Sequence, residues 1–138
     1  MSTTIRSNIS KKNKYWIEKH RYLELRQFCF QYPIWKGAYR AIDGLQHRPW
    51  DLVGFSKGDI SNVVEKAAEQ GLYYSERMRL VESTCYEADP SIAKWLLEGV
   101  TTGLTYEKLN AREQMPCCRE YYYNKYRKFF YLLNKYHY

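Results

Sequence analysis

The sequence of 138 residues predicts an all-α fold with about six helices. Apolar residues recur every three or four positions in several stretches, which is the spacing of one helix face. Capping residues and prolines stand where such helices would begin. No stretch alternates Val, Ile or Thr in the period of two that a strand requires. Hydrophobic residues make up 45% of the chain, so it can bury a substantial core.

The first 55 residues are predicted to contain two basic helices behind a polar tail. Residues 1–13 are rich in Ser, Thr, Asn and Lys and are expected to form a flexible basic tail. A helix over 14–31 should end before Pro33, because the residue preceding a proline avoids the helical region. Pro33 suits the first turn of a second helix that reaches about Ile42. The glycines and proline within 43–55 predict a loop, so the segment 14–55 forms the N-terminal part.

A second helical domain is predicted over 56–138. Ser56 and Asp59 have the spacing of a capping box, which predicts the start of a long helix. Its acidic residues lie largely off the apolar stripe, and Gly71 is expected to break or kink it. Asp89, followed by a proline, predicts another helix start. The apolar stripe comprises Ile60, Val63, Val64, Ala67, Ala68, Tyr74, Met78, Val81 and Cys85. The helix after Asp89 is expected over Ser91–Glu98, with Gly99 and Gly103 bracketing a turn.

The last forty residues have the pattern of a helix-turn-helix motif over 105–135. Thr105 is expected to cap a short helix, Tyr106–Arg112, with Leu109 facing inward. A tight turn over Glu113–Pro116 would lead into a basic helix over Cys117–Lys135. The stripe expected to be buried on that helix comprises Tyr122, Tyr126, Phe129, Leu133 and Tyr136.

Polar side chains away from that stripe have the chemistry of a DNA-reading helix. Arg119 and Asn124 suit the edges of guanine and adenine in the major groove. Arg127 and Lys128 suit phosphates, and the hydroxyl of Tyr123 could add a phosphate contact. A basic amphipathic helix is also often only a solvated face over a core, so this alternative stays open.

The net charge of +7 is unevenly distributed along the chain. Residues 1–50 carry +7, residues 51–100 carry −4 and residues 101–138 carry +4. Two basic ends around an acidic middle favour a nucleic-acid partner, although excess lysine can also simply maintain solubility. The cations expected to add a nonspecific phosphate contribution are Lys11, Lys12, Lys14, Lys19 and Arg21.

Three stretches carry a resemblance to a known family: Leu104–Leu109, Met115–Tyr123 and Arg127–Phe130. This C-terminal part resembles the RinA/ArpU-type late transcription regulators of phages and mobile elements of Firmicutes, whose last helices resemble region four of bacterial sigma factors. The resemblance implies binding of promoter DNA through the C-terminal helix-turn-helix. The turn lacks a glycine, and two cysteines stand where the family more often has serine or another small polar residue. By the resemblance, the DNA-facing residues are Arg119, Glu120, Tyr123, Asn124 and Arg127, and we add Lys128 and Thr105 to the predicted interface.

Other classes of site lack their sequence signatures. The chain has no G-x-S-x-G, Walker A or H-E-x-x-H motif, so we expect neither an enzyme nor a cofactor. No C-x-x-C pair is present and the three histidines stand apart, so no metal site is expected. The four cysteines are expected to be ordinary thiols, although the adjacent pair Cys117 and Cys118 could form a strained disulfide. No apolar run approaches the roughly 20 residues of a membrane helix, and the polar N-terminus predicts no secretory signal. A cytoplasmic location in a bacterial host is therefore expected.

The leading functional hypothesis is a sequence-specific, double-stranded-DNA-binding transcriptional regulator encoded by a phage or prophage. One alternative is a phage-derived protein-binding module that inhibits or redirects a host machine, with the acidic middle and the tyrosine-rich surfaces as its interface. A further alternative is a DNA-packaging component that binds DNA as a ring. The acidic helices within 56–88 could contact RNA polymerase or a second copy of the chain, or could simply be solvated.

Overall fold

The computed structural model describes residues 13–47 and 57–137. These residues form six α-helices and one short 3₁₀ helix, and no strand occurs among them, so the predicted all-α fold is confirmed. The chain divides into two compact units, which we describe separately. Unit 1 comprises the residues up to Gln31 and those from Leu80 onward, and unit 2 comprises Tyr32–Arg79. This division runs through the third helix rather than along the expected boundary at residue 56. Lys11, Lys12, Ser56, the predicted tail before Asn13 and most of the predicted loop lie outside the described residues.

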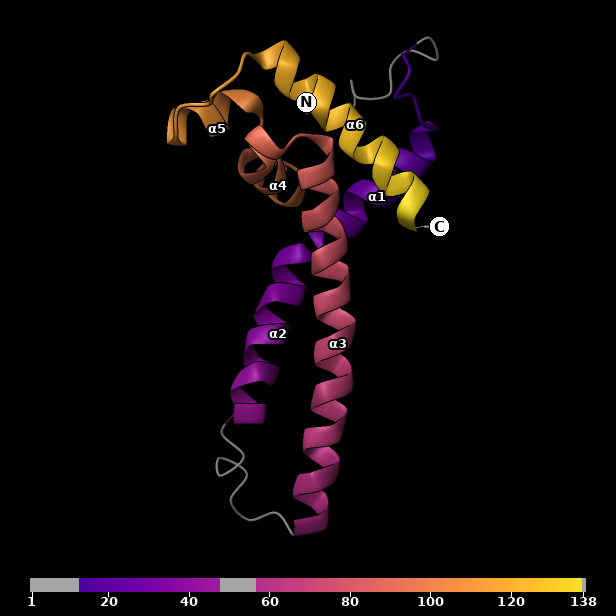
Figure 1. Ribbon diagram of the computed structural model, residues 1–138, viewed down its shortest axis with the longest axis vertical. Helices are drawn as coiled ribbons and strands as arrows, with labels where there is room; N and C mark the ends of the chain where they lie inside the picture. Colours follow the sequence, from indigo (N-terminus) through magenta and orange to yellow (C-terminus); the bar gives the residue numbers. More distant parts are fainter. Residues whose placement is uncertain (1–12, 48–56, 138) are drawn as a thin grey trace. The chain divides into compact units, whose positions relative to one another are not determined.

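Unit 1 gathers the first and the last helices of the chain around one core (Figure 1). Helix α1 packs against α4 and α6, and α4 also contacts α5 and α6. The elements of unit 1 are α1 (Lys19–Phe30), the C-terminal end of α3 (Lys57–Ala88), η3 (Pro90–Ile92), α4 (Ala93–Thr102), α5 (Tyr106–Arg112) and α6 (Arg119–His137).

Aromatic side chains fill the contact between α1 and α6. The ring of Tyr22 meets the ring of Phe130 edge-on at a centroid distance of 5.0 Å. The hydroxyl of Tyr22 lies 3.1 Å from the hydroxyl of Tyr126, and this hydrogen bond joins two fully buried side chains. The largest fully buried side chains of this core are Tyr22, Leu25, Val81, Ile92, Leu96, Val100, Leu109, Tyr122, Tyr126, Phe129, Phe130 and Leu133.

Helix α1 begins at Lys19, five residues later than the sequence predicted. The carboxylate of Glu18 accepts a hydrogen bond from the backbone N–H of His20 at 2.7 Å and so caps the helix. Before it, Asn13 closes a turn by accepting hydrogen bonds from the backbone N–H groups of Tyr15 and Trp16. A helix start needs acceptors for its free N–H groups, and Glu18 supplies one here.

Unit 2 consists of α2 (Tyr32–His47) and the N-terminal part of α3, which lie side by side (Figure 1). Helix α2 extends five residues beyond the predicted end at Ile42, through Gly44. Helix α3 continues without a break through Gly71, so the predicted interruption there is wrong. A Cβ atom at Gly71 would lie 3.6 Å from Ile42 Cγ2 and 3.9 Å from Tyr39 Cε1. Gly71 therefore faces α2, and its small size serves helix packing rather than a kink.

Two predicted features of the middle segment are confirmed and two are corrected. Asp89 caps η3 by accepting a hydrogen bond from the backbone N–H of Ser91 at 2.9 Å, as its spacing indicated. Ala68 belongs to the predicted apolar stripe of α3 but is exposed. Gly99 lies inside α4 instead of beginning a turn, because α4 continues to Thr102. Gly103 ends α4 in the left-handed conformation at φ 79°, which a glycine adopts without a steric cost.

The stripe predicted for the last helix is buried along four of its five positions. Tyr122, Tyr126, Phe129 and Leu133 are all at most 2% exposed. Tyr136 is 49% exposed instead, and its hydroxyl donates a hydrogen bond to Glu87 Oε2 at 2.5 Å. Tyr136 stands in the last turn of α6, beyond the reach of the core, so its hydroxyl bonds a surface carboxylate.

Candidate nucleic-acid interface

The geometry between α5 and α6 departs from a compact helix-turn-helix. Helix α5 matches its predicted bounds, and the hydroxyl of Thr105 caps it by accepting a hydrogen bond from the N–H of Lys108 at 3.3 Å. Helix α6 begins at Arg119 instead of the predicted Cys117, so the connection comprises six residues, 113–118. A DNA-binding motif of this type typically has a turn of three to four residues.

Hydrogen bonds hold this longer connection against α5. The hydroxyl of Tyr106 donates to the carbonyl of Cys117 at 2.6 Å. The side-chain oxygen of Asn110 accepts from the N–H of Met115 at 2.9 Å, and the side chain of Met115 is buried. The connection is therefore ordered by these hydrogen bonds although it contains no glycine, and α5 supports the start of α6.

Arg119 faces α5 rather than open solvent. Its Nε atom lies 2.9 Å from Glu107 Oε2, and its guanidinium carbon lies 5.0 Å from the centre of the Tyr123 ring. Both side chains of this ion pair are about half exposed, at 41% and 59%. An exposed pair of this kind contributes about 0–1 kcal/mol, so a phosphate or base could displace Glu107 at little cost.

Tyr123 is buried, so its predicted place on the outer surface is wrong. Its exposed fraction is 8%, and its hydroxyl accepts a hydrogen bond from the backbone N–H of Tyr106 at 3.1 Å. Helix α5 packs on the flank of the buried stripe and covers this ring. Tyr123 positions α5 on α6, and its burial keeps it from a phosphate outside the helix.

The remaining predicted residues of α6 lie on its outer side. Glu120 is exposed, and Asn124, Arg127 and Lys128 are partly exposed. Positions 120, 124, 127, 128, 131 and 135 fall on one face of a helix, because the steps between them are three or four residues, with 127 and 128 as neighbours on the same arc. We call Asn124, Arg127, Lys128, Tyr131 and Lys135 the outer α6 face.

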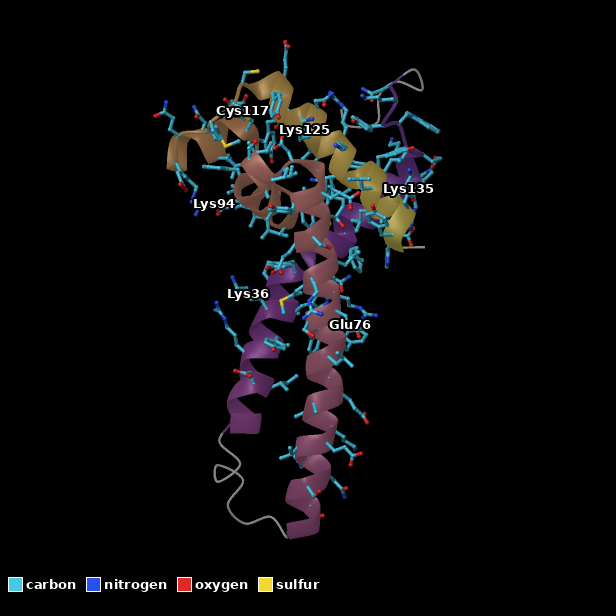
Figure 2. All side chains as sticks on the ribbon, viewed as in Figure 1. Lys36, Glu76, Lys94, Cys117, Lys125 and Lys135 are labelled. Atoms are coloured by element: carbon cyan, nitrogen blue, oxygen red, sulfur yellow. The ribbon has the colours of Figure 1, made fainter. Side chains whose placement is uncertain are left out.

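The outer α6 face is cationic. Glu120 is the only acidic residue within α6, against five Lys and Arg. Among the described residues, no carboxylate forms an ion pair with Arg127, Lys128 or Lys135. Figure 2 shows Lys125 and Lys135 at separate points along α6. Cations that no carboxylate neutralises on one helix face are available to phosphates.

Aromatic rings extend this face toward the N-terminal segment. Tyr15 packs on Tyr131 with a centroid distance of 5.7 Å. The Nζ atoms of Lys14 and Lys135 lie 5.0 Å and 4.8 Å from the centres of the Tyr15 and Tyr131 rings. The predicted DNA interface did not include Tyr15, Tyr131 and Lys135. The steps of four, three and four from Asn124 to Lys135 could have identified the last two.

The predicted N-terminal cations separate into two kinds. Lys14 and Lys19 are exposed. Arg21 is partly buried and bound: its Nε donates to Asn134 Oδ1 at 2.6 Å, and its NH1 group pairs with Glu24 at 2.8 Å. Arg21 therefore joins α1 to α6, and its expected role as a phosphate contact is not supported by its surroundings.

Asp89 organises the other side of the connection. Burial would raise the pKa of its carboxyl, but hydrogen bonds from Ser91 and from the hydroxyl of Tyr121 outweigh burial and lower that pKa. The same hydrogen bond to Asp89 raises the pKa of Tyr121.

Within 13–47 and 57–137, no group of three or more His, Cys, Asp or Glu side chains could hold a metal ion. Helices long and apolar enough to cross a membrane are absent from the same ranges.

The chain was compared with family models, curated proteins and solved structures. No family model, curated protein or solved structure matches the chain.

Proposed function

We propose that this protein is a double-stranded-DNA-binding transcriptional regulator that contacts DNA with the outer α6 face. The observation that supports this most directly is the row of cations without acidic partners among the described residues. Arg127, Lys128 and Lys135 would bind phosphates, which supply most of the affinity of such proteins. The amide of Asn124, on the same face, would read an adenine edge. The resemblance of the C-terminal part to phage late regulators supports the same proposal.

Arg119 would join the interface by exchanging Glu107 for DNA. The exposed ion pair contributes about 0–1 kcal/mol, whereas a good bidentate contact to guanine contributes about 1–3 kcal/mol. Arg119→Ala should therefore weaken binding to the specific site by about 1–3 kcal/mol and leave nonspecific duplex nearly unaffected. Glu107→Gln should retain specific binding, because it only releases Arg119.

The test measures affinity for duplex DNA by fluorescence anisotropy over a series of salt concentrations. The double variant Arg127→Ala/Lys128→Ala should weaken binding and lower the slope of log K against log salt by about 0.9 per lost phosphate contact. Lys36→Ala/Arg40→Ala is the matched control, since it removes the same charge from two exposed residues of α2. Equal effects of the two double variants, or no duplex binding at low salt, would refute the proposal.

A second candidate function, a protein-binding module, rests on the exposed face of α3. Leu72 is 59% exposed and Tyr73 is 49% exposed, and the acidic residues Glu69 and Glu76 flank them. Exposed apolar side chains with charged neighbours are typical of protein interfaces. Recovery from a bacterial lysate of one defined protein that resists nuclease treatment and is lost with Leu72→Glu would favour this candidate.

A further inference from the structure

A cavity of about 420 Å³ lies beside the connection between α5 and α6. Its lining combines apolar walls, from Ile92 and Pro116, with two adjacent thiols. Figure 2 shows Cys117 at this connection. Its volume falls within the range of pockets that hold small molecules. The full lining comprises Ser91, Ile92, Pro116, Cys117, Cys118 and Tyr121.

The four cysteines differ sharply in their access to solvent. Cys29 and Cys85 are at most 1% exposed, and burial raises the pKa of both thiols. Cys117 is partly exposed and Cys118 is exposed. Since a thiol must be reachable and ionised to attack, the core cysteines are protected and the adjacent pair is accessible.

We propose that Cys117 and Cys118 form an oxidisable dithiol that a low-molecular-weight disulfide converts to an intramolecular disulfide. The thiolate of Cys118 attacks one sulfur of the small disulfide, forms a mixed disulfide and releases one small thiolate. The thiolate of Cys117 then attacks Sγ of Cys118 and displaces the second small thiolate. Two protein thiols are oxidised, one external disulfide is reduced to two thiols, and the two protein protons pass to the released thiolates.

The order of the two steps follows from the surroundings of the two thiols. Cys118 is the more exposed, so the external disulfide reaches it first. Burial raises the pKa of Cys117, and the neighbouring charges of Cys118 and Asp89 raise it further. Cys117 is therefore the poorer first nucleophile. It becomes effective when the mixed disulfide is held next to it, in a cavity with room for the small thiol.

The resulting disulfide would be strained and easily reduced. Adjacent Cα atoms across a trans peptide are about 3.8 Å apart, whereas ordinary disulfides join Cα atoms about 4.4–6.8 Å apart. Strained disulfides are the labile, regulatory ones, because strain favours the reduced form. The oxidised pair would thus persist only while the external disulfide is abundant.

Oxidation would act on two backbone carbonyls, one that bonds α5 and one that bonds the first turn of α6. The carbonyl of Cys117 accepts the hydrogen bond from the hydroxyl of Tyr106, and the carbonyl of Cys118 accepts from the N–H of Tyr122 at 3.1 Å. Bringing the sulfurs of Cys117 and Cys118 within bonding distance requires the backbone dihedral angles between them to change, which reorients both carbonyls. The first turn of α6 is therefore expected to loosen when the pair is oxidised.

The experiment treats the reduced full-length protein with oxidised glutathione and follows intact mass. The wild type should lose two hydrogen atoms without retaining glutathione. Trypsin cleavage after Arg112 and Arg119 should place the modification in the peptide 113–119, which contains both thiols. Hydrogen exchange should then accelerate in the first turn of α6, and excess monothiol should reverse both changes. These readouts use no nucleic acid, so the result is independent of the function proposed above.

Two serine variants separate the steps. Cys117→Ser should stop at the mixed disulfide on Cys118, and Cys118→Ser should lose the reaction. Far-ultraviolet circular dichroism confirms that each variant keeps its helices. Three outcomes would overturn the inference: a mixed disulfide that persists in the wild type, modification of Cys29 or Cys85 in the folded protein, or a Cys118→Ser variant that reacts as fast as the wild type.

Discussion

Gly99 of α4 is the position where a single methyl group should disturb the core most clearly. A Cβ atom there would overlap Oη of Tyr122 and would lie 3.3 Å from Cζ of the same ring and 3.4 Å from Leu109 Cδ1. Tyr122 is fully buried, so its ring cannot swing into solvent to make room. A contact far below 3.0 Å against a buried aromatic side chain forces α4 and α6 apart.

Gly99→Ala should lower the free energy of unfolding by about 2 kcal/mol. Overpacking a core costs about 1–3 kcal/mol, and this contact calls for the upper end of that range. The gain in helix propensity on replacing glycine by alanine offsets about 1 kcal/mol. Urea denaturation followed by far-ultraviolet circular dichroism measures the difference.

Tyr122→Phe provides the matched partner of this variant. The hydroxyl of Tyr122 is buried and has no hydrogen-bond partner among the described residues, so its removal should be neutral or stabilising by about 1 kcal/mol. In the double variant the nearest ring atom is 3.3 Å from the new methyl group, a distance that small shifts can accommodate. The double variant should therefore regain most of the lost stability, with a coupling of about 1–2 kcal/mol. Additive effects, or a Gly99→Ala variant as stable as the wild type, would refute this account of the α4–α6 contact.

Two further variants test the ends of helices in unit 1. Gly103→Ala should destabilise the folded protein by about 1–2 kcal/mol, because φ 79° is strained for any residue with a Cβ. That Cβ would also lie 3.3 Å from the ring of Phe30. Thermal denaturation measures the resulting fall in melting temperature. The pKa of Asp89 is lower in the folded protein than in the unfolded chain, so its stabilising contribution is present above about pH 4 and lost as the pH falls below that value. Asp89→Asn keeps a capping oxygen but removes the carboxylate charge from the hydrogen bonds that Ser91 and Tyr121 donate, so it should cost about 1 kcal/mol at neutral pH and less in acid. Denaturation midpoints that fall in parallel for both proteins between neutral and acid pH would contradict this assignment.

Local signals in the sequence located several helix starts correctly. Thr105 and Asp89 cap the elements that their spacing indicated, because a cap depends only on residues two or three positions away. The buried stripe of α6 could be predicted because it depends on residues only three or four positions apart. Other helix bounds were harder to predict: the predicted helix begins at residue 14, whereas Glu18 caps α1 and the helix begins at Lys19.

Contacts between distant segments account for what the sequence could not show. Tyr123 lies off the predicted apolar stripe, which predicts an outward position, yet α5 covers it and Tyr106 donates a hydrogen bond to its hydroxyl. Tyr15 and Tyr131 are more than a hundred residues apart, and no local pattern joins them. From the sequence, Gly71 and Gly99 are predicted to interrupt their helices, whereas the lack of a side chain at each one lets a neighbouring helix pack closely. In each case tertiary packing decided the role of the residue, which intrinsic propensity describes only weakly.

The hydroxyl pair of Tyr22 and Tyr126 contributes to the register of α1 against α6. Aromatic rings tolerate sliding against one another, but two buried hydroxyls bond only when they meet. A shift of α1 along α6 by one turn, about 5.4 Å, would leave both hydroxyls unsatisfied at about 1–3 kcal/mol each. The aligned state alone keeps Tyr15 beside Tyr131 and Arg21 beside Asn134. A polar contact inside this core thus helps to select which surface residues of the first and last helices become neighbours.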